Sequence, residues 1–304
     1  MSTSCPVEPQ PGTGRPGPVT GSKSRDDAIA DYYADAHVRA RIVEFCGAIG
    51  GHPPTAAYLT PLGPLSADGG PCDLARSLWD LDHLIFFLQL DYLNAECPEE
   101  PFLHPADVLL KLEPAYRACR AVFDALDLDV IATVTGRGYH FVGQIPLDAT
   151  LVESLAALVG ETPSWRAAHL TRRPRGITAS ISARHARAAA GLGLLIEHAA
   201  HLILARAWTS AIPFVVNGTT PGSGAAAPEC VSIDFSHVGD PLDVVRIRTA
   251  FSVYSRHQRR PGRFGRRVAA LPALAVLPRD RQPLVTLLTD GRGLDVARHA
   301  AQTA

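Results

Sequence analysis

Hydrophobic and polar residues alternate along the middle of the chain in blocks that predict strands. Residues 83–92 form a nearly continuous apolar run that ends in polar residues, as in a buried strand that presents side chains at its end. Residues 130–134 are short and β-branched, and residues 139–145 predict the returning strand after a turn at Gly136–Gly138. The pattern therefore predicts a buried strand followed by a β-hairpin.

Helical spacing of apolar residues predicts helices between and after these strands. The apolar residues of 113–126 fall on one helical face, and similar patterns cover 149–159 and about 181–208. Residues 212–216 and 230–235 predict two further strands, the first of which contains a proline and therefore suits a strand start or an edge. Strands that alternate with helices indicate an α/β or α+β fold.

The distribution of glycine, proline and apolar residues divides the chain into four parts. Residues 1–24 are rich in Pro, Gly, Ser and Thr and predict a disordered tail. Residues 25–75 contain a helical pattern that ends at clustered glycines and prolines, so we expect an N-terminal helical segment there. The expected core then spans residues 76–270, and a C-terminal segment covers 271–304.

Composition narrows the classes of function only slightly. The chain has 304 residues, 46% hydrophobic and 19% charged, which is ordinary for a globular protein of one large domain or two small ones. The net charge of −1 argues against avid nonspecific nucleic-acid binding, although a local basic patch remains compatible with it. Basic charge is almost entirely arginine, with Lys23 and Lys111 the two lysines, which fits phosphate contacts or a GC-rich genome.

Cysteine spacing and hydropathy predict a cytoplasmic location. The six cysteines include no C-x-x-C pair, so we expect free thiols in a reducing compartment rather than a zinc ribbon or a disulfide scaffold. The N-terminus has no charged segment followed by an apolar run, and it is therefore not expected to be a signal peptide. The most apolar stretch, residues 188–207, is interrupted by charged residues and histidines, which favours a buried helix over a membrane span.

Polar residues that could bind a ligand or take part in catalysis occur at three places, each at or near a predicted strand end. Gln89 and Asp91 alternate on one strand, so both side chains project from the same face. The turn Thr135–His140 combines glycines, which permit close backbone approach to a phosphate, with donors for anionic oxygen. Asp234 ends another apolar strand, and two carboxylates on neighbouring strands can hold divalent metals that clamp a triphosphate.

Each of these places also has a simpler structural explanation. Asp91 can cap a strand or begin a turn, and Gly136–Gly138 can form an ordinary hairpin turn. His140 can be a core histidine with satisfied hydrogen bonds, and Asp234 can form an Asx turn with Ser236. An unrelated α/β protein with fortuitous turns therefore remains an alternative. The occurrence of all three motifs together and in one order argues against it.

The order and spacing of these motifs resemble the archaeo-eukaryotic primase-polymerase superfamily over about residues 80–260. That family has a strand ending in acid-x-acid, a Ser/Thr-Gly-Arg-Gly-aromatic-His turn, and an apolar-Asp strand followed by an arginine-containing segment. Residues 86–91, 135–140 and 231–234 resemble the three motifs, and residues 248–257 resemble the arginine-serine-basic segment. The middle motif is the most specific because six consecutive residues match.

The resemblance implies a primase-polymerase-like catalytic core, with a mixed or antiparallel sheet flanked by helices, that transfers a nucleotide from NTP or dNTP onto a nucleic-acid strand. It implies Mg²⁺ or Mn²⁺ as cofactor, with nucleoside triphosphate and nucleic acid as partners, no membrane, and a protein such as a helicase acting in trans. The catalytic residues would be Asp91, His140 and Asp234, and the metal ligands Asp91, Asp234 and Gln89. Nucleotide binding would fall to Thr135, Gly136, Arg137, Gly138, His140, Arg248, Ser252, Arg256 and His257.

One residue departs from the family pattern and leaves the activity open. Gln89 stands where the family has the first acid of the first motif, so it supplies an amide oxygen but no charge. Glu96 could compensate if a turn returned it to the site. The alternative to a polymerase is therefore a catalytically impaired relative that binds nucleotide or nucleic acid as a sensor or adaptor. The arginines between Arg256 and Arg267 suit either a solvated face or a template track.

Overall fold

The computed structural model describes the side chains and backbone of residues 83–159, 182–207, 211–216 and 228–236, together with a few single residues near the C-terminus. It also describes the backbone of Asn217 and of seven short strands, which are β1 (Ala75–Ser77), β5 (Thr171–Arg172), β6 (Ala179–Ser180), β9 (Arg246–Arg248), β10 (Val253–Tyr254), β11 (Leu274–Ala275) and β12 (Leu277–Pro278). The expected tail and most of the expected N-terminal helical segment lie outside the described residues.

A six-stranded sheet organises the described part of the chain, in the order β12-β3-β4-β2-β8-β7. Its long central strand is β2 (His83–Asn94), which pairs antiparallel with β4 (Gly138–Pro146) and with β8 (Glu229–Asp234). The strands β3 (Ile131–Val134) and β12 continue the sheet antiparallel beyond β4, while β7 (Phe214–Asn217) runs parallel to β8. The predicted mixed sheet of an α/β fold is thus confirmed.

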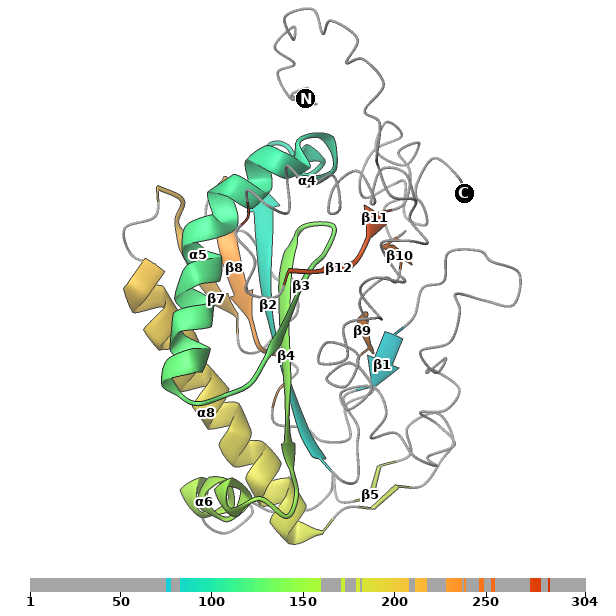
Figure 1. The fold of residues 1–304 in the computed structure, drawn as a ribbon, viewed down its shortest axis with the longest axis vertical. Coiled ribbons are helices and arrows are strands. Elements are labelled where there is room, and N and C mark those ends of the chain that lie inside the picture. Colours follow the sequence, from blue (N-terminus) through green and yellow to red (C-terminus); the bar gives the residue numbers. More distant parts are fainter. Residues whose placement is uncertain are drawn as a thin grey trace, which may run out of the picture.

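In the described residues, four helices accompany the sheet: α4 (Glu100–Leu103), α5 (Pro105–Ala125), α6 (Thr150–Val159) and α8 (Ala183–Ala207). The two long ones, α5 and α8, lie on the same side of the sheet (Figure 1). With them, the chain order β2-α5-β3-β4-α8-β8 is that of a split β-α-β-β-α-β unit, in which β2 lies between β4 and β8. This topology places the middle of β2 at the centre of the sheet.

The hydrophobic core fills the space between the sheet and the helices. Alternate residues of β2, from Leu84 to Tyr92, belong to this core together with Val231 and Ile233 of β8. Phe123 of α5 packs against Phe86 and Phe141 at ring-centroid distances of 6.2 and 5.7 Å. The residues of the strands that belong to this core therefore face α5 and α8, and the alternate residues face away from them.

Two expectations about the elements need correction or extension. The helix predicted over 113–126 begins at Pro105, because a proline at the first helical position needs no backbone donor, and it continues through Pro114. β12, which belongs to the segment expected to follow the core, pairs with β3 at the edge of the sheet. β7 begins directly after Pro213, as the position of that proline predicted.

The long apolar helix agrees with its sequence prediction, whereas the cysteines agree with theirs only in part. Among the described helices, α8 alone is long and apolar enough to cross a membrane, but half of its most apolar window is buried inside the fold, as in a core helix. Gly191 of α8 packs so closely on α6 that a Cβ there would overlap the carbonyl oxygen of Leu155. Cys119 and Cys230 are buried and lie outside any disulfide, as expected for thiols, whereas Cys97 is in a disulfide, contrary to expectation.

Candidate functional site

The sheet face that points away from α5 and α8 is polar near its middle. We call it the polar face and define it by six residues: Gln89, Asp91, Thr133, His140, Ser232 and Asp234. All but Gln89 are buried, with exposed fractions of 4–9%, and Gln89 is half-buried. Burying charges and dipoles costs folding free energy unless they are compensated. A concentration of such groups on one face therefore marks it as a candidate functional site.

The register of the strands brings three of the predicted residues into one row. Gln89 of β2 pairs directly with His140 of β4 on one side and with Asp234 of β8 on the other. Directly opposite residues have Cβ atoms about 4.5–5.5 Å apart. The predicted residues of three motifs, which are separated by up to 145 positions in sequence, therefore meet across neighbouring strands.

Asp91 lies on the same face, two residues beyond this row. It pairs with Gly138 of β4 and with Ser232 of β8, so it is the diagonal neighbour of Asp234. Diagonal neighbours have Cβ atoms roughly 7–8 Å apart, and Mg²⁺–oxygen bonds are about 2.1 Å long, so the two carboxylates can reach one cation between them.

The predicted turn is a tight connection between β3 and β4. The amide nitrogen of Thr135 donates to the carbonyl oxygen of Gly138 at 2.7 Å, and the Thr135 hydroxyl approaches the same oxygen at 3.2 Å. A Cβ on Gly138 would overlap the carbonyl oxygen of Leu90, so this glycine is required for strand packing. The glycine that we assigned to phosphate approach therefore has a structural reason of its own.

Arg137, in the same turn, is bound to Asp91. Its guanidinium nitrogen donates to the Asp91 carboxylate at 2.5 Å, and both side chains are largely buried, at 17% and 11% exposed. The Arg137 carbonyl oxygen accepts a hydrogen bond from the amide of Tyr92 at 2.9 Å, which fixes the turn against β2. The residue expected to bind phosphate and the residue expected to bind metal thus form an ion pair with each other.

Asp234 forms the Asx turn that its sequence context allowed. Its Oδ1 accepts hydrogen bonds from the Ser236 amide at 2.9 Å and from the Ser236 hydroxyl at 2.7 Å. In the described part of the chain, Oδ2 accepts no hydrogen bond. The structural explanation and a ligand role are therefore compatible, because each uses a different oxygen of the carboxylate.

His140 and Thr133 complete the row toward β3. The His140 ring meets Phe87 edge-on, with ring centroids 4.9 Å apart. Thr133 pairs directly with His140, and within the described residues its hydroxyl is buried without a hydrogen-bond partner. An unsatisfied buried hydroxyl costs about 1–3 kcal/mol, which is easier to explain where a ligand supplies the missing partner.

The donor atoms on the polar face suit a hard cation, but they are few. The described residues contain no group of three or more His, Cys, Asp or Glu side chains arranged around one metal position. Two carboxylates and the Gln89 amide are oxygen donors of the kind that Mg²⁺ and Mn²⁺ bind. This set fits a cation, because Arg137 contacts one oxygen of Asp91, Oδ2, and Ser236 contacts one oxygen of Asp234, Oδ1.

The remaining predicted residues are only partly placed. Arg248 lies in β9, which pairs with β1, and only its backbone is described. Ser252, Arg256 and His257 lie outside the described residues, as do the other arginines of that basic cluster. Glu96 is exposed beyond the end of β2, so the strand carries it away from the row and it does not replace the missing acid.

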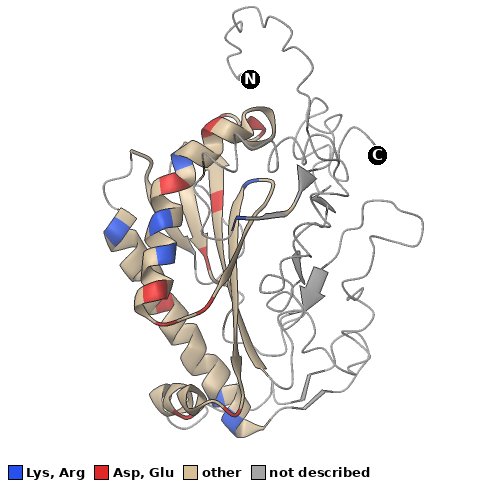
Figure 2. Cartoon of the chain, in the orientation of Figure 1, with Lys and Arg blue, Asp and Glu red and all other residues tan. Residues whose placement is uncertain are grey.

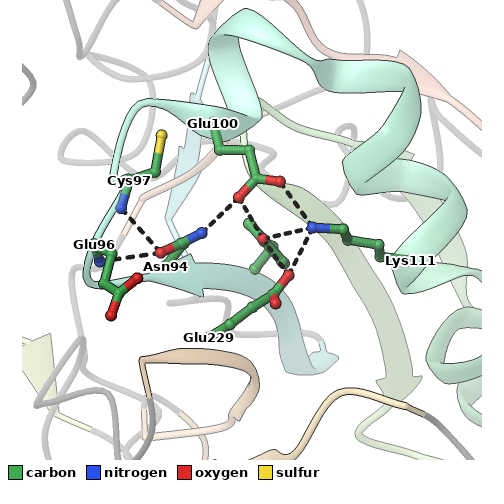
Figure 3. A network of polar contacts seen from close by, with 7 residues as sticks. Asn94, Glu96, Cys97, Glu100, Lys111 and Glu229 are labelled. Atoms are coloured by element: carbon green, nitrogen blue, oxygen red, sulfur yellow. Dashed lines mark hydrogen bonds and ion pairs between the residues drawn. The ribbon is translucent and has the colours of Figure 1, made fainter. Parts of the chain in front are cut away.

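A second polar cluster, which sequence reasoning missed, lies at the end of β2 on the helix side (Figure 3). The Lys111 ammonium donates to Oε1 of Glu100 at 2.8 Å, to Oε1 of Glu229 at 2.7 Å and to the Tyr92 hydroxyl at 3.1 Å. The Tyr92 hydroxyl is 2.5 Å from both carboxylates, and the Asn94 amide donates to Glu100 at 2.6 Å. We call these five residues the lysine cluster.

Burial and the contacts of the lysine cluster shift the pKa values of Lys111, Glu100 and Tyr92. Burial on its own lowers the pKa of Lys111, but hydrogen bonds to Glu100, Glu229 and Tyr92 outweigh burial and raise it. Burial likewise opposes ionisation of Glu100, yet donors from Lys111, Tyr92 and Asn94 lower the pKa of that carboxyl. Burial, reinforced by the two carboxylates, raises the pKa of the Tyr92 hydroxyl. Charged Lys111, charged Glu100 and neutral Tyr92 thus stabilise one another.

A buried arginine forms a separate set of polar contacts on the helix side. Arg279 is 1% exposed, donates to the Tyr139 hydroxyl at 2.6 Å and forms an ion pair with Glu113 of α5. Its guanidinium carbon lies 3.4 Å from the ring centre of Tyr116, a cation–π arrangement. Burial raises the pKa of the Tyr139 hydroxyl, which stays neutral beside Arg279.

Charged residues elsewhere in the described part of the chain are interspersed in sign. Acidic and basic residues both occur along α5 (Figure 2). The polar face is distinguished by the burial and alignment of its side chains.

Comparison of the chain with family models, curated proteins and solved structures finds no match.

Proposed function

We propose that the polar face is a nucleotide site of primase-polymerase type, at which the protein transfers a nucleotide from a nucleoside triphosphate to a nucleic-acid strand. The observation that carries the proposal is the strand register, since Gln89 pairs with both His140 and Asp234. Three motifs that resemble that family in sequence therefore meet in one row, as a shared site requires. Asp91 lies beside this row on the same face.

Each residue has a role that its chemistry and position support. Asp234, with its uncommitted oxygen, and Asp91 hold the divalent cation, and the Gln89 amide lies between Asp234 and His140 as a neutral donor. When bound, Mg²⁺ or Mn²⁺ neutralises charge on the triphosphate and lowers the pKa of the attacking hydroxyl. Arg137 and His140 contact phosphate oxygens, for which a guanidinium fork is well suited.

One observation favours a second candidate, nucleotide binding without polymerisation. Gln89 occupies the centre of the row, where a third carboxylate would share cations with Asp234. With Arg137 paired to Asp91, the polar face has two carboxylates and one guanidinium, a net charge near −1. A two-metal reaction needs more negative charge than this to hold both cations. A sensor or adaptor that binds nucleotide with a single cation does not need additional negative charge.

Primer extension with matched variants tests the first candidate and separates it from the second. The purified protein is given a labelled primer-template, all four dNTPs or NTPs, and Mn²⁺. We expect extension by the wild type and its loss in Asp234→Ala. A control, Asp124→Ala, removes an exposed carboxylate of α5 that pairs with Arg120, and it should extend as the wild type does.

The variant Gln89→Asp provides the second arm. If the wild type binds nucleotide but does not extend the primer, and Gln89→Asp does, the chain is a nucleotide-binding relative that has lost the central acid. Equal extension by the wild type and Asp234→Ala would contradict the proposed site. Extension lost in Asp124→Ala as well would indicate a folding defect, which circular dichroism would reveal.

A further inference from the structure

We propose that the Thr133 hydroxyl binds a sugar hydroxyl of the nucleotide, so that the polar face recognises the ribose as well as the triphosphate. The inference rests on the proposed nucleotide site and adds to it a residue that the sequence motifs do not include. Thr133 is 4% exposed, and among the described residues its hydroxyl has no hydrogen-bond partner.

The strand alternation places Thr133 on the polar face. Its chain neighbours Ala132 and Val134 belong to the hydrophobic core on the helix side, so the Thr133 side chain leaves β3 on the opposite face. Thr133 pairs directly with His140, and the Cβ atoms of such a pair are about 4.5–5.5 Å apart. A buried hydroxyl without a partner is destabilising, and a ligand bound beside His140 would supply the missing hydrogen bond.

The order of side chains along the row matches the order of groups in a nucleoside triphosphate. The row runs from Asp234 on β8 through Gln89 on β2 and His140 on β4 to Thr133 on β3. Neighbouring strands lie about 4.8 Å apart, so three steps separate the carboxylate from the hydroxyl by roughly 14 Å. With the cation at Asp234 and phosphate at His140, the uncharged sugar of the nucleotide lies next to Thr133.

The neighbours of Thr133 favour a neutral partner over a phosphate. Two positions earlier in β3, on the same face, lies Ile131, which pairs with the buried Val142 of β4. Phe87 of β2 pairs with Val142 in turn. Apolar neighbours of this kind do not compensate the charge of a phosphate. A sugar hydroxyl is neutral and, like the threonine hydroxyl, both donates and accepts, so the two groups satisfy each other without burial of a charge.

Calorimetric titration of ATP and two deoxy analogues, all with Mn²⁺, tests the inference in the wild type. 2′-Deoxy-ATP and 3′-deoxy-ATP each lack one of the two ribose hydroxyls. The analogue that lacks the bound hydroxyl leaves Thr133 without its partner, so one of the two should bind about tenfold more weakly than ATP. Which analogue is weakened identifies the hydroxyl, and weakening of 2′-deoxy-ATP would make the site selective for ribonucleotides.

Variants of Thr133 show whether this residue is the cause. Thr133→Val keeps the shape of the side chain and removes the hydroxyl, so it should bind ATP about tenfold more weakly and no longer distinguish ATP from the weakened analogue. Thr133→Ser retains a hydroxyl and should retain the discrimination. Thr150→Val makes the same substitution at the exposed start of α6, and as the control it should bind all three nucleotides as the wild type does.

The outcomes separate this inference from the nucleotide site on which it rests. If the wild type binds ATP and both analogues equally, or if Thr133→Val keeps the discrimination, Thr133 does not bind the sugar and the nucleotide site stands. Equal weakening of all three nucleotides in Thr133→Val, with near-UV circular dichroism unchanged, would also overturn the sugar contact. If the wild type binds none of the three, the nucleotide site is wrong and the sugar contact falls with it.

Discussion

Asp91 and Tyr92 are consecutive residues of β2 whose side chains enter two polar clusters of different character. Tyr92 enters the lysine cluster on the helix side, where Lys111 bonds to three partners and Glu100 accepts from three donors. Asp91 enters the polar face, where Thr133 has an unpaired buried hydroxyl and Asp234 has an uncommitted oxygen. Their opposite directions follow from the two-residue period of a strand.

The difference teaches that the number of charges does not distinguish a site from a structural contact. The lysine cluster holds more charged groups than the central row of the polar face, yet its members satisfy one another, and Lys111 and Glu229 are partly exposed to water. The polar face is nearly buried and incompletely paired. Proteins keep such unfavourable groups where a ligand or a reaction requires them. Variants on the helix side should therefore lower stability, whereas variants on the polar face should change binding without lowering stability.

The largest expected loss of stability is at Arg279, the buried arginine of the helix side. Arg279→Met removes the partner of Glu113 and Tyr139 from a site that is 1% exposed, so the free energy of unfolding should fall by about 3 kcal/mol. Urea denaturation measures it. Arg117→Met, which removes an exposed partner of the same glutamate, should cost under about 1 kcal/mol. Equal losses in the two variants would show that burial does not set the cost.

Lys111→Met should have the next largest effect and sharpen the contrast between the clusters. It leaves Glu100 and Glu229 next to each other without their shared donor, so the free energy of unfolding should fall by about 2 kcal/mol, reduced by partial exposure to water. Affinity for Mn²⁺ and ATP should stay within about twofold, because the cluster lies on the other face. If the folded variant changed the affinity by more than this, the lysine cluster and the polar face would have to act as one site.

Thr133→Val should have a smaller effect of opposite sign. The substitution removes a buried hydroxyl that has no partner among the described residues, so the free energy of unfolding should rise by about 1 kcal/mol. Thermal denaturation measures this gain, with Thr150→Val on the exposed end of α6 as the control. A loss of stability would mean that the hydroxyl is satisfied, which would weaken the contrast drawn above.

The smallest effect is the contribution of Glu100 to the pH dependence of stability. Because the folded-state pKa of Glu100 lies below its ordinary value of 4.5, its contribution is present above that value and is lost as the pH falls through the folded pKa. Urea denaturation between about pH 5 and pH 3 should show a shallower decline for Glu100→Gln than for the wild type. Parallel declines would show that Lys111 does not stabilise the charged form of Glu100.

The strands β2, β3, β4, β7 and β8 could be predicted from local alternation, and so could four of the six residues of the polar face, Gln89, Asp91, His140 and Asp234. Thr133 and Ser232 were missed, because neither is a residue that the motifs specify. β2 begins at the predicted residue, His83, and Gln89 and Asp91 share a face as their spacing requires. The start of α5 could not be fixed, since both Pro105 and Pro114 suit a first helical turn. Local pattern carries no information about which of two prolines is tolerated inside a helix.

Long-range pairing could not be predicted, because it depends on registers that local pattern does not encode. Tyr92 and Glu229 are 137 residues apart, and Arg279 and Glu113 are 166 residues apart. The contact between Arg137 and Asp91 also depends on the turn before β4 lying against the end of β2. Sequence motifs identified both residues but gave no indication that they would bind each other.

Nucleotide binding on the polar face can be tested by calorimetric titration of Mn²⁺–ATP. The wild type, Asp234→Ala and the control Asp124→Ala are titrated in the same buffer. The account predicts binding by the wild type and the control, and at least tenfold weaker binding, or about 1.4 kcal/mol, in Asp234→Ala. Equal affinity in all three proteins would place the nucleotide elsewhere and contradict the account.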